Sequence, residues 1–121
     1  MAKKRILVVD DEEWIAKVLQ MRLEANGYEV LVAHDGQEGL ETAQKEKPDL
    51  VLLDRMLPRM DGYKVCGLLK KDARFSSIPI IMLTAMTQNP ETESDVPADA
   101  YMMKPFDPPA LLGKIRELIG E

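Results

Sequence analysis

Cysteine is almost missing from this chain of 121 residues, since Cys66 stands alone between Val65 and Gly67. A lone cysteine cannot form an internal disulfide, so the fold must be stabilised by its hydrophobic core. The length and the hydrophobic content of 45% are enough for one domain that buries such a core. We therefore expect a single domain over residues 1–121, with Cys66 as a small core residue rather than a nucleophile.

Long hydrophobic runs are missing too. The longest aliphatic runs, residues 6–9 and 50–53, are far shorter than the roughly 20 residues of a membrane span. The first of them is also too short for a signal-peptide core, and no small-residue cleavage site follows it. These features predict a protein that stays in the cytoplasm and has no membrane partner.

Basic clusters and glycine-rich phosphate loops are not found either. A formal net charge of −5 without a basic stripe argues against direct nucleic-acid binding by this domain. A P-loop nucleotide enzyme would need a glycine-rich stretch that ends in Gly-Lys-Ser or Gly-Lys-Thr, and the chain has none.

What the chain does contain is an alternation of short apolar runs and helical patterns. The apolar runs are residues 6–9, 30–33, 50–53, 78–83 and 100–103, and they are typical of strands buried on both faces. Between them, helical spacing places apolar residues on one face of each segment: Ile15, Val18, Leu19 and Leu23; Leu40 and Ala43; Val65, Leu68 and Leu69; Leu111, Leu112, Ile115, Leu118 and Ile119. About five such alternations predict an α/β fold with a mostly parallel sheet, in which ligands bind beyond the carboxyl ends of the strands.

Polar residues follow the predicted strands at that edge. Asp10 and Asp11 follow the first strand, Asp54 the third, Thr84 the fourth and Lys104 the fifth. Three carboxylates brought together repel one another unless a positive charge lies among them, and Mg²⁺ prefers oxygen ligands of this kind. A carboxylate, a divalent cation, a hydroxyl and a lysine are also the groups that phosphoryl transfer requires, with Asp54 as the candidate nucleophile.

Each of these residues also has a simpler explanation when it is taken alone. Asp10 or Asp11 can cap the helix that follows, with Glu12 and Glu13 in its first turn. Asp54 can be a turn residue, Thr84 a strand former and Lys104 a solvated charge. Four independent coincidences at strand ends are much less probable than one shared site.

Four motifs resemble the receiver domain of two-component response regulators, of the single-domain, chemotaxis-regulator type. They are VVDDE (8–12), LLDRMLPRMDG (52–62), IIMLTA (80–85) and YMMKPF (101–106), in the order of that family and close to its spacing. The resemblance extends over essentially the whole chain. It implies a flavodoxin-like, doubly wound, five-stranded parallel sheet with strand order 2-1-3-4-5, a topology for which a member of this family is a standard example.

The resemblance also implies a phosphoacceptor function. Asp54 would take a phosphoryl group from a sensor histidine kinase or a histidine phosphotransfer protein. Asp10, Asp11, Asp54 and the backbone carbonyl of Met56 would bind Mg²⁺. The domain would catalyse its own phosphorylation and dephosphorylation, and would signal to an unknown downstream protein rather than act as an enzyme on another substrate.

Lys104 and Thr84 would contact the phosphoryl oxygens, and Thr84 and Tyr101 would form the switch. An alternative for Tyr101 is a strand-end tyrosine with its hydroxyl at the surface. The resemblance further implies a cis bond between Lys104 and Pro105.

Residues 87–101 depart from the pattern of the family, which places its fourth helix there. The stretch has no apolar residue between Thr87 and Asp95, and Pro90 and Pro97 bracket it. Because most helical stability comes from burying an apolar face, we expect an atypical, short or mobile fourth helix. The alternative is a shortened loop without consequence.

Several other functions fit less well. A phosphatase of the haloacid dehalogenase class needs a second Asp where Met56 stands, and a flavodoxin needs Ser, Thr and Gly where this chain has acids. A degenerate receiver that acts without phosphorylation ranks second. The sequence leaves open whether the chain is a free-standing receiver or part of a longer regulator.

Overall fold

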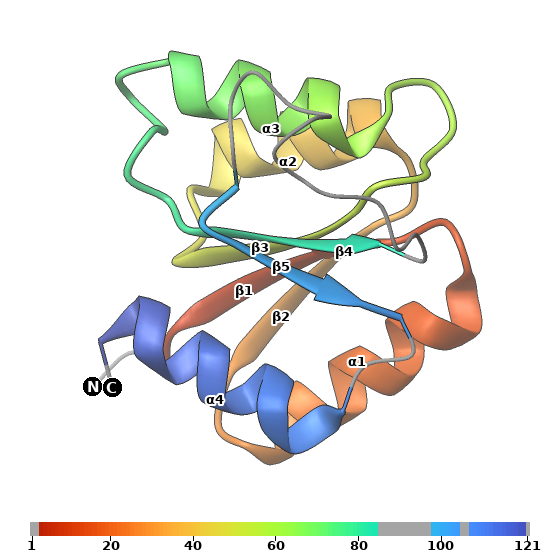
Figure 1. The fold of residues 1–121 in the computed structure, drawn as a ribbon, viewed down its shortest axis with the longest axis vertical. Coiled ribbons are helices and arrows are strands. Elements are labelled where there is room, and N and C mark those ends of the chain that lie inside the picture. The colour runs from red at the N-terminus through yellow and green to blue at the C-terminus, as the bar shows by residue number, and fades with distance from the viewer. Residues whose placement is uncertain (1–2, 85–97, 105–106, 121) are drawn as a thin grey trace.

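A computed structural model describes residues 3–84, 98–104 and 107–120. Within these ranges the strands are β1 (Arg5–Val9), β2 (Glu29–Ala33), β3 (Leu50–Asp54), β4 (Ile80–Thr84) and β5 (Ala100–Met103). The helices are α1 (Glu13–Ala25), α2 (Gly36–Glu46), α3 (Gly62–Lys71) and α4 (Pro108–Ile119). Figure 1 shows three layers, with α2 and α3 on one face of the sheet and α1 and α4 on the other.

The sheet is parallel throughout, in the order β2-β1-β3-β4-β5. This order and the flavodoxin-like arrangement confirm the prediction from sequence. The register pairs Val9 with Leu53 and Thr84 with Met103, so the carboxyl ends of β1, β3, β4 and β5 meet at one edge. The polar residues at the strand ends are therefore brought to the same edge of the sheet.

The three central strands form the core, as predicted for strands covered on both faces. Every residue of β3 is buried, and in β1 and β4 all are buried except Arg5 and Thr84. The two edge strands differ from the prediction: β2 is partly exposed, and no residue of β5 is fully buried. An edge strand has a strand neighbour on one side, so its side chains are less completely covered.

The helix faces differ from the predicted ones at two positions. Val18 is 51% exposed and Leu68 is 40% exposed, whereas the small side chains of Ala16 and Cys66 are buried. The buried face of α1 is made of Ala16, Leu19 and Leu23, and that of α3 includes Val65, Cys66 and Leu69, so each helix is rotated away from Val18 or Leu68. The expectation that Cys66 is a core residue is confirmed.

The ends of α2, α3 and α4 follow from capping chemistry. The carboxylates of Asp35 and Asp61 accept hydrogen bonds from the backbone N–H groups of Glu38 and Lys64, three residues into their helices. Asp107 occupies the N-cap position of α4 without a side-chain cap bond, and Gly120 ends that helix in a left-handed conformation with φ of 91°.

Two predictions lie outside the described residues. The expected atypical fourth helix falls mostly on residues 85–97, and the expected cis bond involves Pro105. The label α4 is given to the last helix of the described ranges. Both expectations stay predictions.

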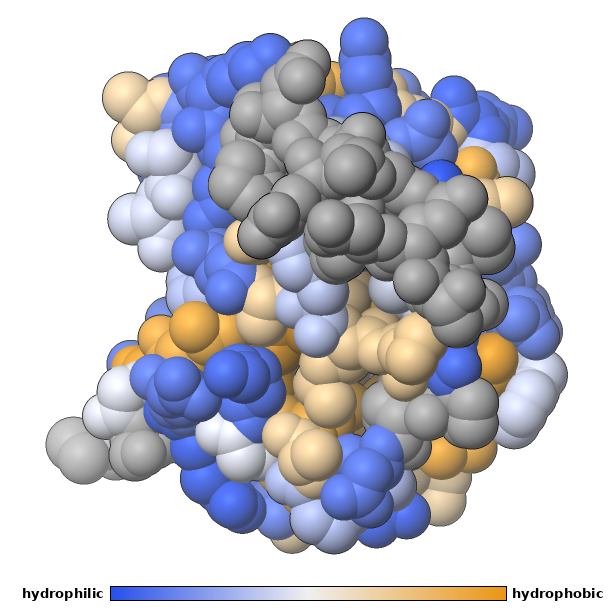
Figure 2. All heavy atoms as spheres, in the orientation of Figure 1, coloured by the Kyte–Doolittle hydropathy of each residue, from blue (hydrophilic) through white to orange (hydrophobic). Residues whose placement is uncertain are grey.

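The described surface is mixed in character. Figure 2 shows hydrophilic residues over much of one face and a band of more hydrophobic residues at the level of the sheet, between α3 and α4. None of the helices in residues 3–84, 98–104 and 107–120 has the length and hydropathy that a membrane span requires.

Candidate functional site

Three carboxylates converge at the carboxyl edge of the sheet. Asp10 directly follows β1, and Asp54 is the last residue of the neighbouring β3. Oxygen atoms of Asp10, Asp11 and Asp54 all lie within 4.8 Å of one another. Asp10 is fully buried and Asp54 is 5% exposed, whereas Asp11 faces the solvent. We call these three residues the acid cluster.

The ammonium group of Lys104 lies against the acid cluster. Its Nζ atom donates hydrogen bonds to Asp54 Oδ2 at 3.0 Å and to Asp10 Oδ2 at 3.3 Å. The lysine side chain is 17% exposed, and its backbone N–H donates to the carbonyl of Thr84 at 2.7 Å. The interpretation of Lys104 as a solvated edge charge is therefore wrong, because its charge is largely buried and paired.

Asp10 also has a local structural role. Its Oδ1 atom accepts a hydrogen bond of 2.9 Å from the backbone N–H of Glu12, the N-cap residue of α1, while Oδ2 faces Lys104. Glu12 occupies the N-cap position of α1 without a side-chain cap bond, so the expectation that Asp10 or Asp11 caps this helix is wrong. The Oδ1 atom of Asp10 instead closes the turn before the helix, and Oδ2 belongs to the acid cluster. Glu13 lies in the first turn of α1, where its charge favours the positive end of the helix.

The pKa values of Asp54 and Lys104 both depart from their ordinary values. Burial lowers the pKa of Lys104, but the hydrogen bond and charge of Asp54 and the charge of Asp10 outweigh it, so its pKa is raised. For Asp54, burial raises the pKa, the hydrogen bond and charge of Lys104 lower it, and the Asp10 charge raises it again. The net direction for Asp54 is upward, because one ammonium group does not compensate for both burial and a neighbouring carboxylate.

This donor set suits a hydrated Mg²⁺ ion. The ion takes oxygen ligands and usually keeps several waters beside one or two carboxylates. The cluster offers a carboxylate oxygen from each of three residues, and the exposed Asp11 leaves one side open to water. Lys104 supplies one positive charge against three carboxylates, so negative charge remains for a cation to neutralise.

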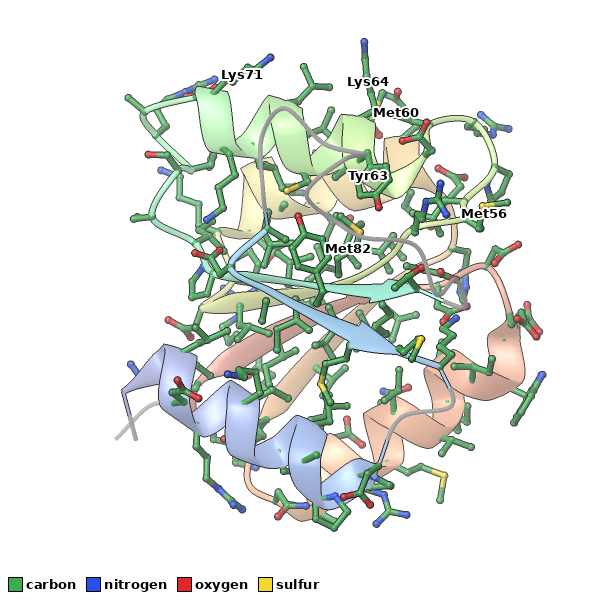
Figure 3. The ribbon with its side chains drawn as sticks, in the orientation of Figure 1. Met56, Met60, Tyr63, Lys64, Lys71 and Met82 are labelled. Atoms are coloured by element: carbon green, nitrogen blue, oxygen red, sulfur yellow. The ribbon has the colours of Figure 1, made fainter. Side chains whose placement is uncertain are left out.

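Met56 and Thr84 border the acid cluster. The backbone N–H of Met56 donates to Asp54 Oδ1 at 3.3 Å, and its side chain is 66% exposed. Figure 3 shows Met56 on the loop that leads from β3 to α3. Thr84 ends β4, and its predecessor Leu83 is the register partner of Asp54. The chain therefore places both predicted residues beside Asp54.

Tyr101 is held at the start of β5. Its hydroxyl oxygen accepts a hydrogen bond of 3.0 Å from the backbone N–H of Ala98. The half-buried ring packs against the core cluster between the sheet and the α2–α3 layer. The interpretation of Tyr101 as a strand-end tyrosine with its hydroxyl at the surface does not describe this arrangement, because the hydroxyl oxygen accepts a hydrogen bond from the backbone.

Two glycines that the sequence analysis did not single out shape the loop after Asp54. A Cβ atom on Gly62 would collide with the carbonyl oxygen of Asp54, and one on Gly36 would collide with that of Met60. Backbone bonds fix the same loop, from Gly62 N–H to the Arg55 carbonyl at 2.8 Å and from Gly36 N–H to the Pro58 carbonyl at 3.2 Å. The Asp61-Gly62 pair is the sequence signal that could have indicated this close approach.

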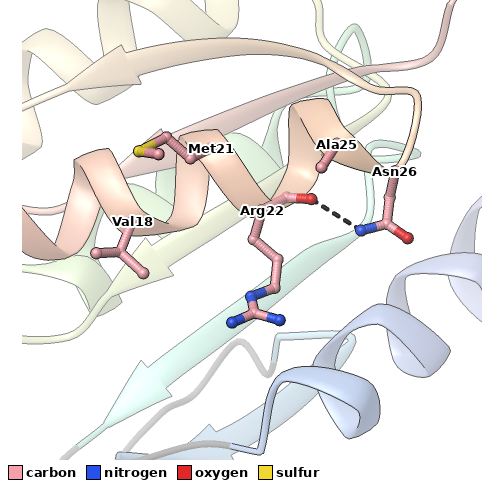
Figure 4. Close-up of a pocket in the computed structure, with 5 residues that line it drawn as sticks. All are labelled: Val18, Met21, Arg22, Ala25 and Asn26. Atoms are coloured by element: carbon pink, nitrogen blue, oxygen red, sulfur yellow. Dashed lines mark hydrogen bonds between the residues drawn. The ribbon is translucent and has the colours of Figure 1, made fainter.

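An open groove lies elsewhere, on the second half of α1. Figure 4 shows its lining, and its volume is about 340 Å³. Asn26 Nδ2 donates there to the carbonyl of Arg22 at 2.8 Å. The groove contains none of the residues of the acid cluster, so it is not the predicted site. Its lining residues are Val18, Met21, Arg22, Ala25 and Asn26.

Comparison with known proteins identifies the family. Residues 6–116 match the response regulator receiver domain. The chain is 50% identical over 119 residues to the probable transcriptional regulator ycf27 of Cyanophora paradoxa, covering 97% of this chain and 48% of that protein. It is 44% identical over 118 residues to the alkaline phosphatase synthesis transcriptional regulatory protein PhoP of Bacillus subtilis, covering 96% of this chain and 48% of PhoP. The chain thus spans about half the length of the curated relatives it matches.

Solved structures agree with this result. A response regulator structure from Chloroflexus aurantiacus superposes with a TM-score of 0.91 at 31% identity, covering 99% of this chain and all of that one. The receiver domain of a sensor histidine kinase from Pseudomonas aeruginosa, solved with magnesium in its active-site cleft, gives 0.90 at 29% identity, covering 99% and 100% of the two chains.

The chain therefore belongs to the response regulator receiver domain family. It is a phosphoacceptor signalling domain of two-component systems rather than an enzyme that acts on a separate substrate.

Proposed function

We propose that Asp54 is the phosphoacceptor and that residues 1–121 form a single receiver domain. The observation that carries the assignment is the contact of 3.0 Å between Lys104 Nζ and Asp54 Oδ2, beside the carboxylates of Asp10 and Asp11. A nucleophilic carboxylate needs an exposed path for the donor and a cation for the incoming charge. Asp54 has the cation beside it and ends its strand at the edge where ligands bind in this fold.

In the proposed reaction, one carboxylate oxygen of Asp54 forms a bond to the phosphorus of a phosphohistidine. The bond between that phosphorus and the imidazole nitrogen breaks, and its electron pair stays on the imidazole, which takes a proton from solvent. The products are an acyl phosphate on Asp54 and a histidine. Lys104 neutralises the charge on the phosphoryl oxygens, which is where most of the catalytic benefit of such sites arises.

Mg²⁺ is the proposed cofactor, held by Asp10, Asp11 and Asp54 together with the backbone carbonyl of Met56. When bound, it supplies positive charge that screens the phosphoryl oxygens from the carboxylates. Asp10 is suited to this role because its Oδ1 atom is fixed by the Glu12 N–H, which holds the carboxylate in one orientation.

Thr84 and Tyr101 are the proposed switch. Thr84 ends the strand next to Asp54, where its hydroxyl can donate to a phosphoryl oxygen. Movement of Thr84 would be transmitted along β5, whose residue Met103 is its register partner. Tyr101 lies on the same short strand, two residues before Met103.

The same residues account for dephosphorylation by water. Water attacks the phosphorus of the acyl phosphate, the bond to the Asp54 oxygen breaks, and the carboxylate is regenerated with release of inorganic phosphate. Both phosphorylation and dephosphorylation are thus proposed as reactions of the domain on itself, with Asp54 as the group that is modified.

The proposed phosphoryl donor is a sensor histidine kinase or a histidine phosphotransfer protein in the cytoplasm. The proposed output is a change in a protein-contact surface that a downstream protein recognises. We propose no direct nucleic-acid binding by this domain. The curated relatives are named as transcriptional regulators and are about twice as long, so such binding would reside in other parts of those proteins.

Incubation with acetyl phosphate and Mg²⁺, followed by rapid intact-mass measurement, tests the assignment. We expect the parent chain to gain the mass of one phosphoryl group, and Asp54→Asn to gain none. Asp72→Asn is the matched control, because Asp72 pairs with Arg74 on the surface and lies outside the acid cluster. Equal modification of Asp54→Asn and the parent would refute the assignment. Lack of modification in a folded parent would favour the degenerate receiver.

A further inference from the structure

A second ion pair, partly covered, lies at the opposite end of the sheet from the acid cluster. Lys70, in the last turn of α3, places its Nζ atom 2.6 Å from Asp99 Oδ2, just before β5. The side chain of Lys70 is 13% exposed and that of Asp99 is 35% exposed. A lysine so well covered is uncommon unless its charge is paired, and the phosphotransfer site does not account for it.

The pair joins several backbone segments. Lys70 Nζ also donates to the carbonyls of Ser76 and Ile78, at 3.2 and 2.9 Å, in the connection between α3 and β4. Asp99 Oδ2 accepts a hydrogen bond of 2.7 Å from the N–H of Ile80, the first residue of β4. The N–H of Asp99 donates in turn to the Ile80 carbonyl at 2.9 Å. We call Lys70 and Asp99, with these bonds, the Lys70–Asp99 clasp.

The strand that follows the clasp carries two residues of the proposed site. Tyr101 belongs to β5 and Lys104 directly follows it. β5 has four residues, is the last strand in the sheet and is paired with β4 in the described part of the chain. At its start, the Tyr101 hydroxyl accepts from Ala98, one residue before Asp99; at its end, Lys104 N–H bonds to Thr84.

We propose that Lys70 and Asp99 are positioning residues for phosphotransfer, holding the start of β5 against β4 so that the strand delivers Lys104 to Asp54. This inference rests on the proposed function of Asp54 and Lys104. A short edge strand with a partner on one side opens most easily at its ends. The clasp closes the end that is remote from the site.

Removing either partner breaks more than the ion pair. Without Lys70, the carboxylate of Asp99 loses its cation. About a third of the Asp99 side chain is exposed, so water then competes with the N–H of Ile80 for hydrogen bonds to this carboxylate. Without the Asp99 carboxylate, the Lys70 ammonium is left buried with two carbonyls. In both cases the start of β5 loosens, and Lys104 spends less time in contact with Asp54.

Phosphorylation rates provide the first test. Lys70→Met keeps the length of the side chain and removes its charge. We expect a rate with acetyl phosphate about three- to tenfold below the parent, less than the roughly 100-fold loss of a catalytic group misplaced by about 1 Å, because Lys104 still reaches Asp54 for part of the time. Lys71→Met is the matched control and should match the parent. Lys71 is exposed and, in Figure 3, extends from α3 away from the sheet. Lys70→Arg keeps charge and donors and should recover most of the rate.

A double substitution separates positioning from general stability. If Lys70 acts through Lys104, then Lys70→Met should slow phosphorylation in the parent but not further in a Lys104→Ala background. Intact mass over long incubation follows the slow residual reaction. An equal fold-loss in both backgrounds would overturn the proposal, because the effect would not pass through Lys104. So would an unchanged rate in Lys70→Met.

Asp99→Asn is the second route, should Lys70→Met fail to fold. Its amide oxygen can still accept from Ile80 N–H while its charge is lost, so we expect a smaller loss of rate than in Lys70→Met and faster amide exchange at Ala100 and Tyr101. Parent-like rate and exchange would overturn the proposal. A parent chain that takes no phosphoryl group at all would instead contradict the proposed function, so the two failures are distinguishable.

Discussion

Lys104 Nζ and Asp54 Oδ2 lie 3.0 Å apart, although the two residues are 50 positions apart in the chain. The contact exists because β3 and β5 flank β4 in a parallel sheet, so both strands end at the same edge. It places a buried cation beside a buried carboxylate at the position where ligands bind in this fold.

Asp54→Asn should stabilise the fold at neutral pH in the absence of divalent cations. The folded pKa of Asp54 is raised, chiefly by burial, so the folded state binds this proton more tightly than the unfolded chain. The stability that follows is fully present below the unfolded pKa and is lost as pH rises through the folded pKa. At pH 7 the charged carboxylate of Asp54 therefore lowers the free energy of unfolding, and the substitution by asparagine removes this effect.

Urea unfolding at pH 7 and at pH 3 checks this prediction. We expect the midpoint of Asp54→Asn to exceed that of the parent at pH 7, and the difference to shrink at pH 3, where the parent is protonated as well. A lower midpoint for the variant at pH 7 would mean that the pair with Lys104 outweighs burial.

Trp14 should report on the acid cluster. It lies in the first turn of α1, close in sequence to Asp11, and is 68% exposed. We expect millimolar Mg²⁺ to change its fluorescence, with the change absent in Asp11→Ala. A parent spectrum unaffected by Mg²⁺ would exclude Trp14 as a reporter.

Cys66 should be inert in the folded protein. Burial raises the pKa of its thiol to about 11, with the nearby Lys70 and Asp99 charges acting in opposite directions. At pH 8 a thiol of ordinary pKa is ionised to about a quarter, so we expect a thiol reagent to react at least about 100-fold more slowly with the folded chain than with the unfolded chain. Similar rates in buffer and in denaturant would contradict the burial of Cys66.

Met56 should influence how long the acyl phosphate survives. Its N–H contacts Asp54, and its exposed side chain stands at the solvent boundary of the site. An apolar side chain there does not orient water, so we expect a slow parent and about a two- to tenfold change in hydrolysis rate in Met56→Asn. Met21→Asn is the control, since Met21 is 61% exposed on α1 outside the acid cluster. Equal lifetimes of the acyl phosphate in the parent, Met56→Asn and Met21→Asn would exclude this role for Met56.

Much of the site could be predicted because parallel topology places strand ends together. Asp10, Asp11, Asp54 and Lys104 each follow or end an apolar run, and the alternation of strands and helices assigns all of them to one edge. The order of the strands, however, came from the family resemblance and not from the pattern alone. Local pattern carries no information on which strand pairs with which.

The remaining details depend on contacts between distant segments. The helical period marks a face of α1 and α3, but it does not fix the rotation of each helix about its own axis. Ala16 and Cys66 are buried, whereas Val18 and Leu68 are exposed. The Lys70–Asp99 clasp was also missed. Both residues look like ordinary surface charges until the fold brings α3 and the start of β5 together.

Chemical trapping tests most directly whether Asp54 carries the phosphoryl group. Borohydride reduces an acyl phosphate, and converts a phosphorylated aspartate to homoserine, which peptide mass spectrometry can locate. After treatment with acetyl phosphate and Mg²⁺, we expect homoserine at position 54 in the parent chain and unmodified aspartate at positions 10 and 11. Homoserine at position 10 or 11, or unmodified Asp54 in a chain that has gained phosphate, would contradict the account.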